Sequence, residues 1–177
     1  MTFDDYLAIK NLIHRYPQCA DKGDFSGVGK LLGNAMMGHH GDEPSYLAEG
    51  PEKFAEIYTG TVRKFPGRDT PRTRHLIGNI IIEDDGPDRA RAESYVMVFQ
   101  QTDTLPLQAI IGGTYFDRFA KVGGEWQMIE RFEDMELIGD ISEHVLRERL
   151  AAAPRHSEEK IIRLLGKLVI RAARYGH

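Results

Sequence analysis

Four residues of types that carry proton chemistry are spread along the chain: Tyr16, Asp21, His75 and Arg131. A carboxylate bonded to one ring nitrogen of a histidine fixes the tautomer and leaves the other nitrogen as a general base. An arginine stays charged and stabilises developing negative charge, and a tyrosine hydroxyl donates to a departing or carbonyl oxygen. Brought to one cavity, the four residues would suit proton abstraction followed by elimination.

Each of these residues also has an ordinary structural explanation. Asp21 follows a predicted helix, where aspartate is typical of a turn or cap. His75 alternates with apolar residues on one strand face, where a lone histidine is usually part of the core. Arg131 lies in a predicted strand and is suited to a cross-strand ion pair with Glu133 or Asp117. What decides between these interpretations is whether the fold brings the residues together.

The first part of the chain predicts helices. Apolar residues at helical spacing precede the sequence Asp21-Lys22-Gly23, which ends the first helix. Tyr16 lies on the apolar face of this helix and is therefore also a candidate core residue. A second helix is expected over Asp24–Leu32, and Gly50-Pro51 opens a third that runs to about Phe65.

After Pro71 the pattern changes to long β-rich runs separated by hairpin turns such as Gly123-Gly124. Gly112-Gly113 lies inside the third run and predicts a bulge or sharp bend. Helices followed by bent antiparallel strands indicate an α+β cone, in which N-terminal helices cover the concave side of a strongly bent sheet. The four runs are Thr73–Asp84, Arg89–Asp103, Leu107–Val122 and Glu125–Gly139.

Three segments carry a family resemblance. They are Ile9-Lys10-Asn11-Leu12 with the following Tyr16 and Asp21, then Thr73–Asn79, and Gly112–Phe119. They resemble the polyketide-cyclase-like (SnoaL-like) branch of the superfamily of scytalone dehydratase, ketosteroid isomerase and nuclear transport factor. The resemblance extends from Phe3 to Gly139 and implies the same cystatin-like cone.

The resemblance also implies roles for the four residues. In bile-acid 7α-dehydratase the active set is Tyr, Asp, His and Arg, and Tyr16, Asp21, His75 and Arg131 fill those places. Asp21, His75 and Arg131 likewise match hexachlorocyclohexane dehydrochlorinase, in which an Asp–His dyad abstracts a proton, but Tyr16 replaces that family's lysine. Scytalone dehydratase has a second pocket histidine with no clear equivalent, and the adjacent histidines 39 and 40 are its possible substitutes.

We therefore expect a cofactor-independent lyase of the dehydratase type, with no bound metal, acting on a bulky hydrophobic steroid-, terpenoid- or polyketide-like substrate. One alternative is a double-bond isomerase like ketosteroid isomerase, which uses a carboxylate base deeper in the cone. Another is a non-catalytic ligand-binding or assembly module like the small subunit of a ring-hydroxylating dioxygenase.

The composition of the chain argues against several kinds of partner, metal site and location. The net charge of −4 argues against nucleic acid as a partner, and the single cysteine, Cys19, excludes an internal disulfide and a zinc site built from cysteines. The acidic start lacks the layout of a signal peptide, and no run reaches the ~20 apolar residues of a membrane span, so we expect a cytoplasmic protein.

We expect residues 1–140 to form the cone and residues 141–177 a helical extension. The extension predicts helices over Ser142–Ala153 and Ser157–Tyr175, and the second is amphipathic and basic. We expect that helix to pack on protein, on this domain or on a partner subunit, and not on a membrane. The resemblance implies a homo-oligomer, a dimer or trimer.

Overall fold

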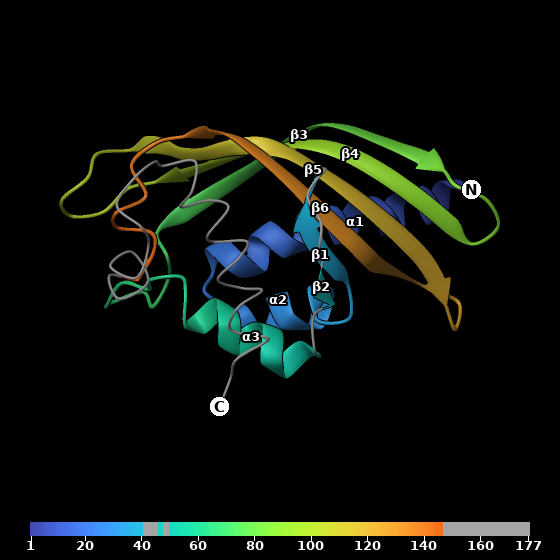
Figure 1. Cartoon of the computed structure of the whole chain (residues 1–177), viewed down its shortest axis with the longest axis horizontal. Helices are drawn as coiled ribbons and strands as arrows, with labels where there is room; N and C mark the ends of the chain where they lie inside the picture. The colour runs from blue at the N-terminus through green and yellow to red at the C-terminus, as the bar shows by residue number, and fades with distance from the viewer. Residues whose placement is uncertain (41–45, 48–49, 147–177) are drawn as a thin grey trace.

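The computed structural model describes residues 1–40, 46–47 and 50–146, and within them an α+β fold. One six-stranded sheet, in the order β2-β1-β6-β5-β4-β3, arches over three helices that lie on its concave side (Figure 1). The predicted fold class is confirmed. The concave side of the sheet and the facing side of the helices enclose the core.

The helices begin where their caps predict. α1 (Phe3–Asp21) starts with a capping box between Thr2 and Asp5 and buries residues at helical spacing against the sheet. α2 (Phe25–Leu32) is capped by Asp24. α3 (Pro51–Thr59) ends sooner than the expected Phe65, because the chain turns away after Gly60 and Val62 pairs with Val145 instead.

The four predicted β runs form the antiparallel body of the sheet. They are β3 (Thr73–Asp84), β4 (Arg89–Gln100), β5 (Gln108–Val122) and β6 (Glu125–Ile138). The sheet also contains two short strands that the sequence did not predict as such. β1 (Met36–His39) pairs in parallel with β6, and β2 (Tyr46–Leu47) pairs with β1. Runs this short carry too little alternation to be recognised without their partner strand.

The sheet bends where the sequence places two glycines. The register between β5 and β6 shifts between Gly112 and Thr114. A Cβ on Gly113 would lie 2.1 Å from the carbonyl oxygen of Asp134, so only glycine allows this close approach. A second register shift, between Gly78 and Ile81, bends β3 against β4. These bends make the concave side on which the candidate site lies.

The chain reverses after β6, and the helix expected to start at Ser142 is absent from the described part. Ser142–His144 form a turn, and Val145 then pairs with Val62. A bridge to Val62, in the segment that follows α3, replaces the first turn of that helix. The rest of it and the helix expected over Ser157–Tyr175 lie outside the described residues. Among the helices described, none is long and apolar enough to cross a bilayer.

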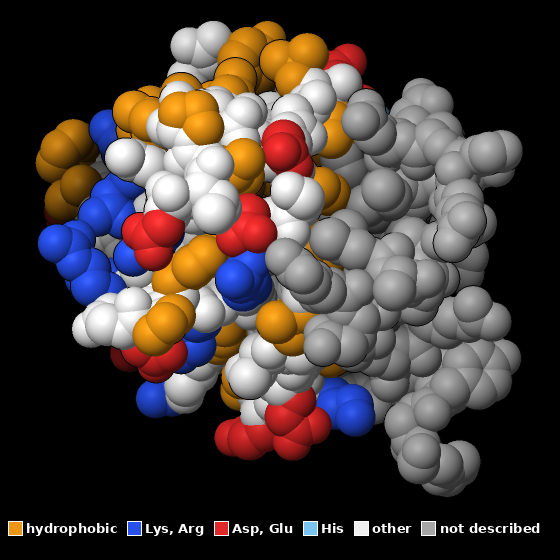
Figure 2. Space-filling model, turned by 90° about the vertical axis from the view of Figure 1, so that its left-hand side faces the viewer, with side chains coloured by type: hydrophobic (Ala, Val, Ile, Leu, Met, Phe, Trp, Pro, Cys, Tyr) orange, Lys and Arg blue, Asp and Glu red, His pale blue; other side chains and the backbone are white. Residues whose placement is uncertain are grey.

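The convex side of the sheet carries exposed hydrophobic side chains. Leu76, Met97, Gly112 and Leu137 are successive partners across β3, β4, β5 and β6, so they form one row on this side. Leu76, Leu137 and the neighbouring Tyr95 are more than half exposed. Figure 2 shows hydrophobic side chains gathered along the upper part of the molecule, the side on which the sheet lies in Figure 1.

Candidate active site

Asp21 is the last residue of α1, where the helix meets the start of β3. Its position depends on the turn that follows, in which Gly23 has a φ of 70° and its N–H donates to the carbonyl of Ala20. A Cβ on Gly23 would lie 2.5 Å from the carbonyl oxygen of Asp69, so a larger residue would displace the turn. The carboxylate that emerges is only 11% exposed.

The Asp21 carboxylate accepts three hydrogen bonds from the first residues of β3. Oδ1 accepts from the Thr73 hydroxyl at 2.7 Å and lies 2.7 Å from His75 Nδ1, and Oδ2 accepts from the His75 backbone N–H at 3.0 Å. Burial opposes ionisation, but His75 and the Thr73 hydroxyl hold the pKa of Asp21 below its usual value. An ionised carboxylate only accepts, so Nδ1 carries a proton, and in the neutral ring Nε2 keeps a lone pair.

His75 projects from β3 toward the core. Its register partner is the buried Val98, and the next residue, Leu76, lies on the opposite, convex side. The His75 side chain is 9% exposed. A histidine with one nitrogen fixed by a carboxylate and the other available is the arrangement of a general base.

Tyr16 reaches the same region from α1. Its ring lies edge-on to that of His75, with centroids 6.1 Å apart, and its hydroxyl is 2.6 Å from the hydroxyl of Tyr58 on α3. A third buried phenol, Tyr115 of β5, packs edge-on against Tyr16. Burial foremost, and then the charge of Glu133, raise the pKa of Tyr16, while Arg131 opposes that rise. Tyr16 is therefore protonated at neutral pH and can donate.

Arg131 is fully buried beneath the tyrosines and forms the cross-strand pair with Asp117. Its Nε and Nη2 donate to the two Asp117 oxygens at 2.8 and 2.7 Å. The guanidinium carbon lies 4.5 Å from the centre of the Tyr16 ring and 4.1 Å from that of Tyr115. Nη1 has no hydrogen-bond partner among the described residues. Arg131 thus contacts the site through Tyr16 and is held in place by Asp117 through Nε and Nη2.

The four candidate residues thus form a chain of contacts, from Asp21 through His75 and Tyr16 to Arg131. Sequence reasoning missed Thr73, Tyr58 and Tyr115, which support that chain. Thr73 was detectable, because it lies two residues before His75 and therefore on the same strand face. The tyrosines gave no comparable signal.

The second pocket histidine does not come from residue 40. The side chain of His40 is exposed and stacks on Phe116, with ring centroids 4.0 Å apart, and the side chain of His39 lies outside the described residues. The histidine near the dyad is His144, in the turn after β6. Burial first, and repulsion from His75 when it is protonated second, lower the pKa of His144 to about 4, and Asp21 opposes this.

This lowered pKa predicts a pH dependence of stability. The unfolded chain protonates His144 near its ordinary value of 6.5, while the folded chain does so at about 4. Acidification between those values therefore favours the unfolded state, by up to about 3–4 kcal/mol at 1.36 kcal/mol per pH unit over about 2.5 pH units. The pKa of the Asp21 carboxylate lies below its usual 3.8, so protonation of Asp21 lowers the unfolding free energy further only at lower pH.

We therefore expect His144→Gln to flatten the fall in unfolding free energy between pH 7 and pH 4.5, measured by urea denaturation. His14→Gln, on α1, is the matched control and should leave the fall unchanged. An identical slope for wild type and His144→Gln would contradict the prediction.

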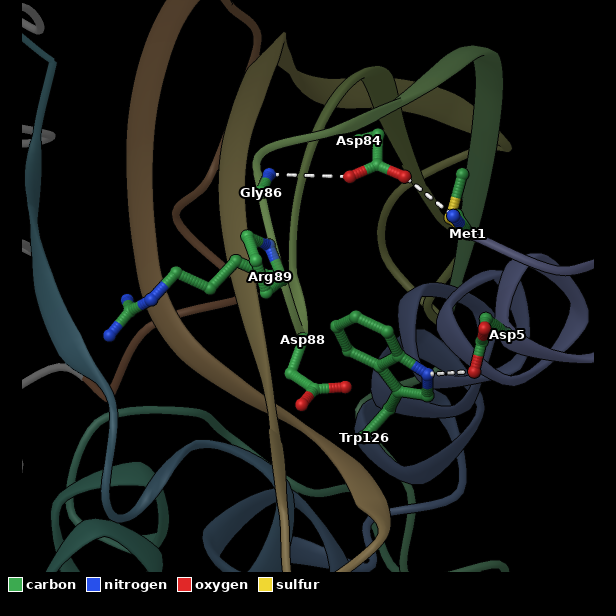
Figure 3. Close-up of a pocket in the computed structure, with 8 residues that line it drawn as sticks. Met1, Asp5, Asp84, Gly86, Asp88, Arg89 and Trp126 are labelled. Carbon is green, nitrogen blue, oxygen red and sulfur yellow. Dashed lines mark hydrogen bonds and ion pairs between the residues drawn. The ribbon is translucent and has the colours of Figure 1, made fainter.

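Among the described residues no three histidine, cysteine or acidic side chains converge as a metal site. A separate hollow of about 340 Å³ lies at the far end of the sheet, between the start of α1 and the β3–β4 turn (Figure 3). Two of the three acids that line it are engaged: Asp84 accepts from the Met1 amine and the Gly86 N–H, and Asp5 accepts from Lys121 and Trp126. These contacts fasten α1 to the sheet, so we assign the hollow a structural role.

The profile of the SnoaL-like domain family matches residues 1–132, and the chain belongs to this family. No curated protein matches the chain. Similar solved structures include a protein of unknown function with a cystatin-like fold from Nostoc punctiforme, which is 24% identical with a TM-score of 0.59 and covers 77% of this chain and 94% of its own.

Two further structures extend the comparison. A protein of unknown function from Mycobacterium tuberculosis is 21% identical with a TM-score of 0.63, over 97% of this chain and 90% of its own. A candidate scytalone dehydratase from Novosphingobium aromaticivorans is 20% identical with a TM-score of 0.60. The match covers 77% of this chain and 87% of that protein. At these identities the likeness establishes the cystatin-like fold.

Proposed function

We propose that the protein is a cofactor-independent lyase that removes water from a bulky hydrophobic substrate. The observation that carries the proposal is the buried Asp21–His75 pair, in which the carboxylate fixes Nδ1 and leaves Nε2 as the base. The family to which the chain belongs, and the candidate scytalone dehydratase among its structural neighbours, favour this chemistry.

The elimination needs one base and one donor. His75 Nε2 takes a proton from a carbon next to a carbonyl or similar activating group, and the C–H electron pair becomes the new C=C bond. The C–O bond on the neighbouring carbon breaks, and the departing hydroxide takes the Tyr16 proton and leaves as water. The proton on His75 then returns to Tyr16 through solvent, which restores both groups.

The environment of Tyr16 is compatible with this role. Burial raises the pKa of Tyr16, so the phenol keeps its proton at neutral pH and can donate it to the departing hydroxide. Arg131 lies over the phenol ring and favours the negative charge that develops there. In this mechanism Arg131 is a positioning residue that acts through Tyr16.

The substrate class follows from the surroundings of the base. The side chains that share the inner face with His75 include Ile77 on the same strand and Val98 opposite it. Apolar walls with a few convergent polar groups are typical of sites for hydrophobic ring compounds. A steroid, terpenoid or polyketide-like ring carrying a β-hydroxy ketone satisfies both requirements.

The test is to incubate the protein with a panel of cyclic β-hydroxy ketones in deuterated water. Enone formation is followed by ultraviolet absorbance and loss of water by mass spectrometry. We expect both signals, with loss of both in His75→Ala. Deuterium uptake without water loss would point to isomerisation, and neither signal in any compound that binds would favour a non-catalytic binding module.

The isomerase alternative has one observation in its favour. Glu133 raises the pKa of Tyr16, Tyr58 and Tyr115, so its carboxylate lies close to the buried tyrosines. A carboxylate base facing tyrosine donors is the arrangement that the isomerase reaction requires. Under this alternative Glu133→Gln, and not His75→Ala, would abolish deuterium uptake.

We also propose that the convex side of the sheet pairs with a second copy of the chain. An exposed apolar row of this length is unusual on a free monomer surface. We expect Leu76→Lys combined with Leu137→Lys to lower the mass measured by light scattering from dimer or trimer to monomer. A control change at the exposed Leu107 should leave the mass unchanged. A monomeric wild-type protein would contradict this proposal.

A further inference from the structure

The turn after β6 is held in place on both sides of His144. The backbone N–H of Arg63 donates to the His144 carbonyl at 2.9 Å, and the N–H of Leu146 donates to the Thr61 carbonyl at 3.0 Å. Arg63 and Glu143 also form an ion pair at 2.6 Å. The His144 backbone is therefore fixed against the segment that follows α3.

A glutamine ties this turn to the dyad. Gln100 Nε2 lies 3.0 Å from the Pro71 carbonyl and 3.5 Å from the Glu143 carbonyl, and Gln100 is the strand partner of Thr73. Thr73 in turn donates to Asp21. The residue next to His144 is thus linked through Gln100 to the strand residues that support the catalytic carboxylate.

The His144 ring has a buried nitrogen with nothing to bond. Nδ1 is shielded from solvent and has no hydrogen-bond partner among the described residues. Buried polar atoms are almost always satisfied, so an unsatisfied one calls for an explanation, and a partner that binds there is one such explanation. The ring is close enough to His75 and Asp21 for their charges to act on it, so that partner would lie beside the dyad.

We propose that His144 is a substrate-contacting residue whose ring hydrogen-bonds an oxygen of the substrate other than the one bound by Tyr16. This inference rests on the proposed function, because it takes His75 as the base at the centre of the site. It assigns the second oxygen of the β-hydroxy ketone, the one that does not leave, to a contact with His144. One oxygen meets Tyr16 and the other meets His144.

His144 is suited to binding and not to proton abstraction. Burial and the neighbouring His75 keep it neutral at physiological pH, and the same lowering of its pKa makes it a weak base. A neutral imidazole holds a substrate oxygen without exchanging a proton with it, as in enzymes that pair a neutral histidine with a separate base. His144 therefore binds the substrate, and His75 transfers the proton.

The experiment measures affinity for three probes of one shape by calorimetry: tetralin, 1-tetralone and 4-hydroxy-1-tetralone. In wild type we expect each added oxygen to tighten binding. In His144→Leu the affinity gained from the second oxygen should be lost. The affinity for 4-hydroxy-1-tetralone should therefore fall by about 3- to 10-fold, the range expected for one hydrogen bond. Tetralin affinity should not change, and His14→Leu should behave as wild type.

A second variant shows whether the lost affinity comes from the lost contact or from a folding defect. His144→Gln keeps both a donor and an acceptor, and we expect it to restore much of the gain from the second oxygen. In wild type, the ring nitrogens of His144 should shift in ¹⁵N NMR on addition of 4-hydroxy-1-tetralone and not of tetralin. Equal affinity of wild type and His144→Leu for every probe, or no oxygen-dependent binding, would overturn the inference.

These results separate the inference from the proposed function. Binding to His144 needs no turnover, so Asp21→Asn should keep the oxygen-dependent gain even though it loses elimination. Turnover that depends on His75, with binding indifferent to residue 144, would refute only the role of His144. Binding that depends on His144, without any elimination, would refute only the lyase.

Discussion

Replacement of Asp21 by asparagine is expected to lower turnover by about 10⁴-fold, the loss seen when a catalytic histidine loses its carboxylate. Asparagine has nearly the same shape, and its carbonyl can still accept from Thr73 or from the His75 backbone. Its amide, however, donates to Nδ1. The His75 ring then carries its proton on Nε2, where it cannot act as a base.

The measurement is kcat/KM for the best β-hydroxy ketone, together with circular dichroism and urea unfolding to confirm the fold. His75→Ala sets the lowest kcat/KM expected, because it removes the base itself. Thr73→Val is the graded control: it deletes one hydrogen bond to Asp21 and leaves the pair, so we expect a loss of 10-fold or less. Turnover in Asp21→Asn within 10-fold of wild type would exclude the dyad from the mechanism.

The parts of the fold that the sequence predicted are those with local signals. β3 was predicted with its observed ends, Thr73 and Asp84, because a β-rich run stands between Pro71 and the turn residues Asp85-Gly86-Pro87. The bend at Gly112-Gly113 was predicted because glycine inside a strand has few other uses. Asp21 and His75 were found because one ends a helix, the other faces inward on a strand, and both match family motifs.

The parts that were missed depend on contacts between distant segments. Tyr58 meets Tyr16 across 42 residues, and nothing near Tyr58 in the sequence marks it as part of a site. His144 was taken as part of a helix because residues from Ser142 onward favour helix, whereas pairing of Val145 with Val62 decides the conformation. Tertiary pairing overrode local propensity there, and it also ended α3 at Thr59.

The second large effect is expected at the buried Arg131–Asp117 pair. Both side chains are fully inaccessible, so Arg131→Met leaves an uncompensated carboxylate in the core. Breaking such a pair from one side typically costs about 3–5 kcal/mol. We expect a loss of that size in the unfolding free energy, measured by urea denaturation. Arg131→Lys should also be destabilised, because an ammonium cannot make the two-pronged contact with Asp117.

A double variant separates stability from chemistry. Arg131→Met with Asp117→Val removes both charges, and apolar replacement of a buried pair is often neutral, so we expect most of the lost stability to return. Turnover should not return with it. Arg131 lowers the pKa of Tyr16 against the effect of burial, so without Arg131 the Tyr16 proton is held more tightly. We expect kcat to fall about 10²-fold, the lower end of the range for loss of one electrostatic contact.

The pH profile of the double variant is the readout that a purely structural role would not move. In wild type the basic limb of the rate profile reports the loss of the Tyr16 proton, and it should shift to higher pH once the cation is gone. A double variant with restored stability, wild-type turnover and an unshifted basic limb would show that Arg131 serves the fold alone. In that case the burial of Arg131 between Tyr16 and Tyr115 would be a packing solution, and the lyase mechanism would rest on Asp21, His75 and Tyr16.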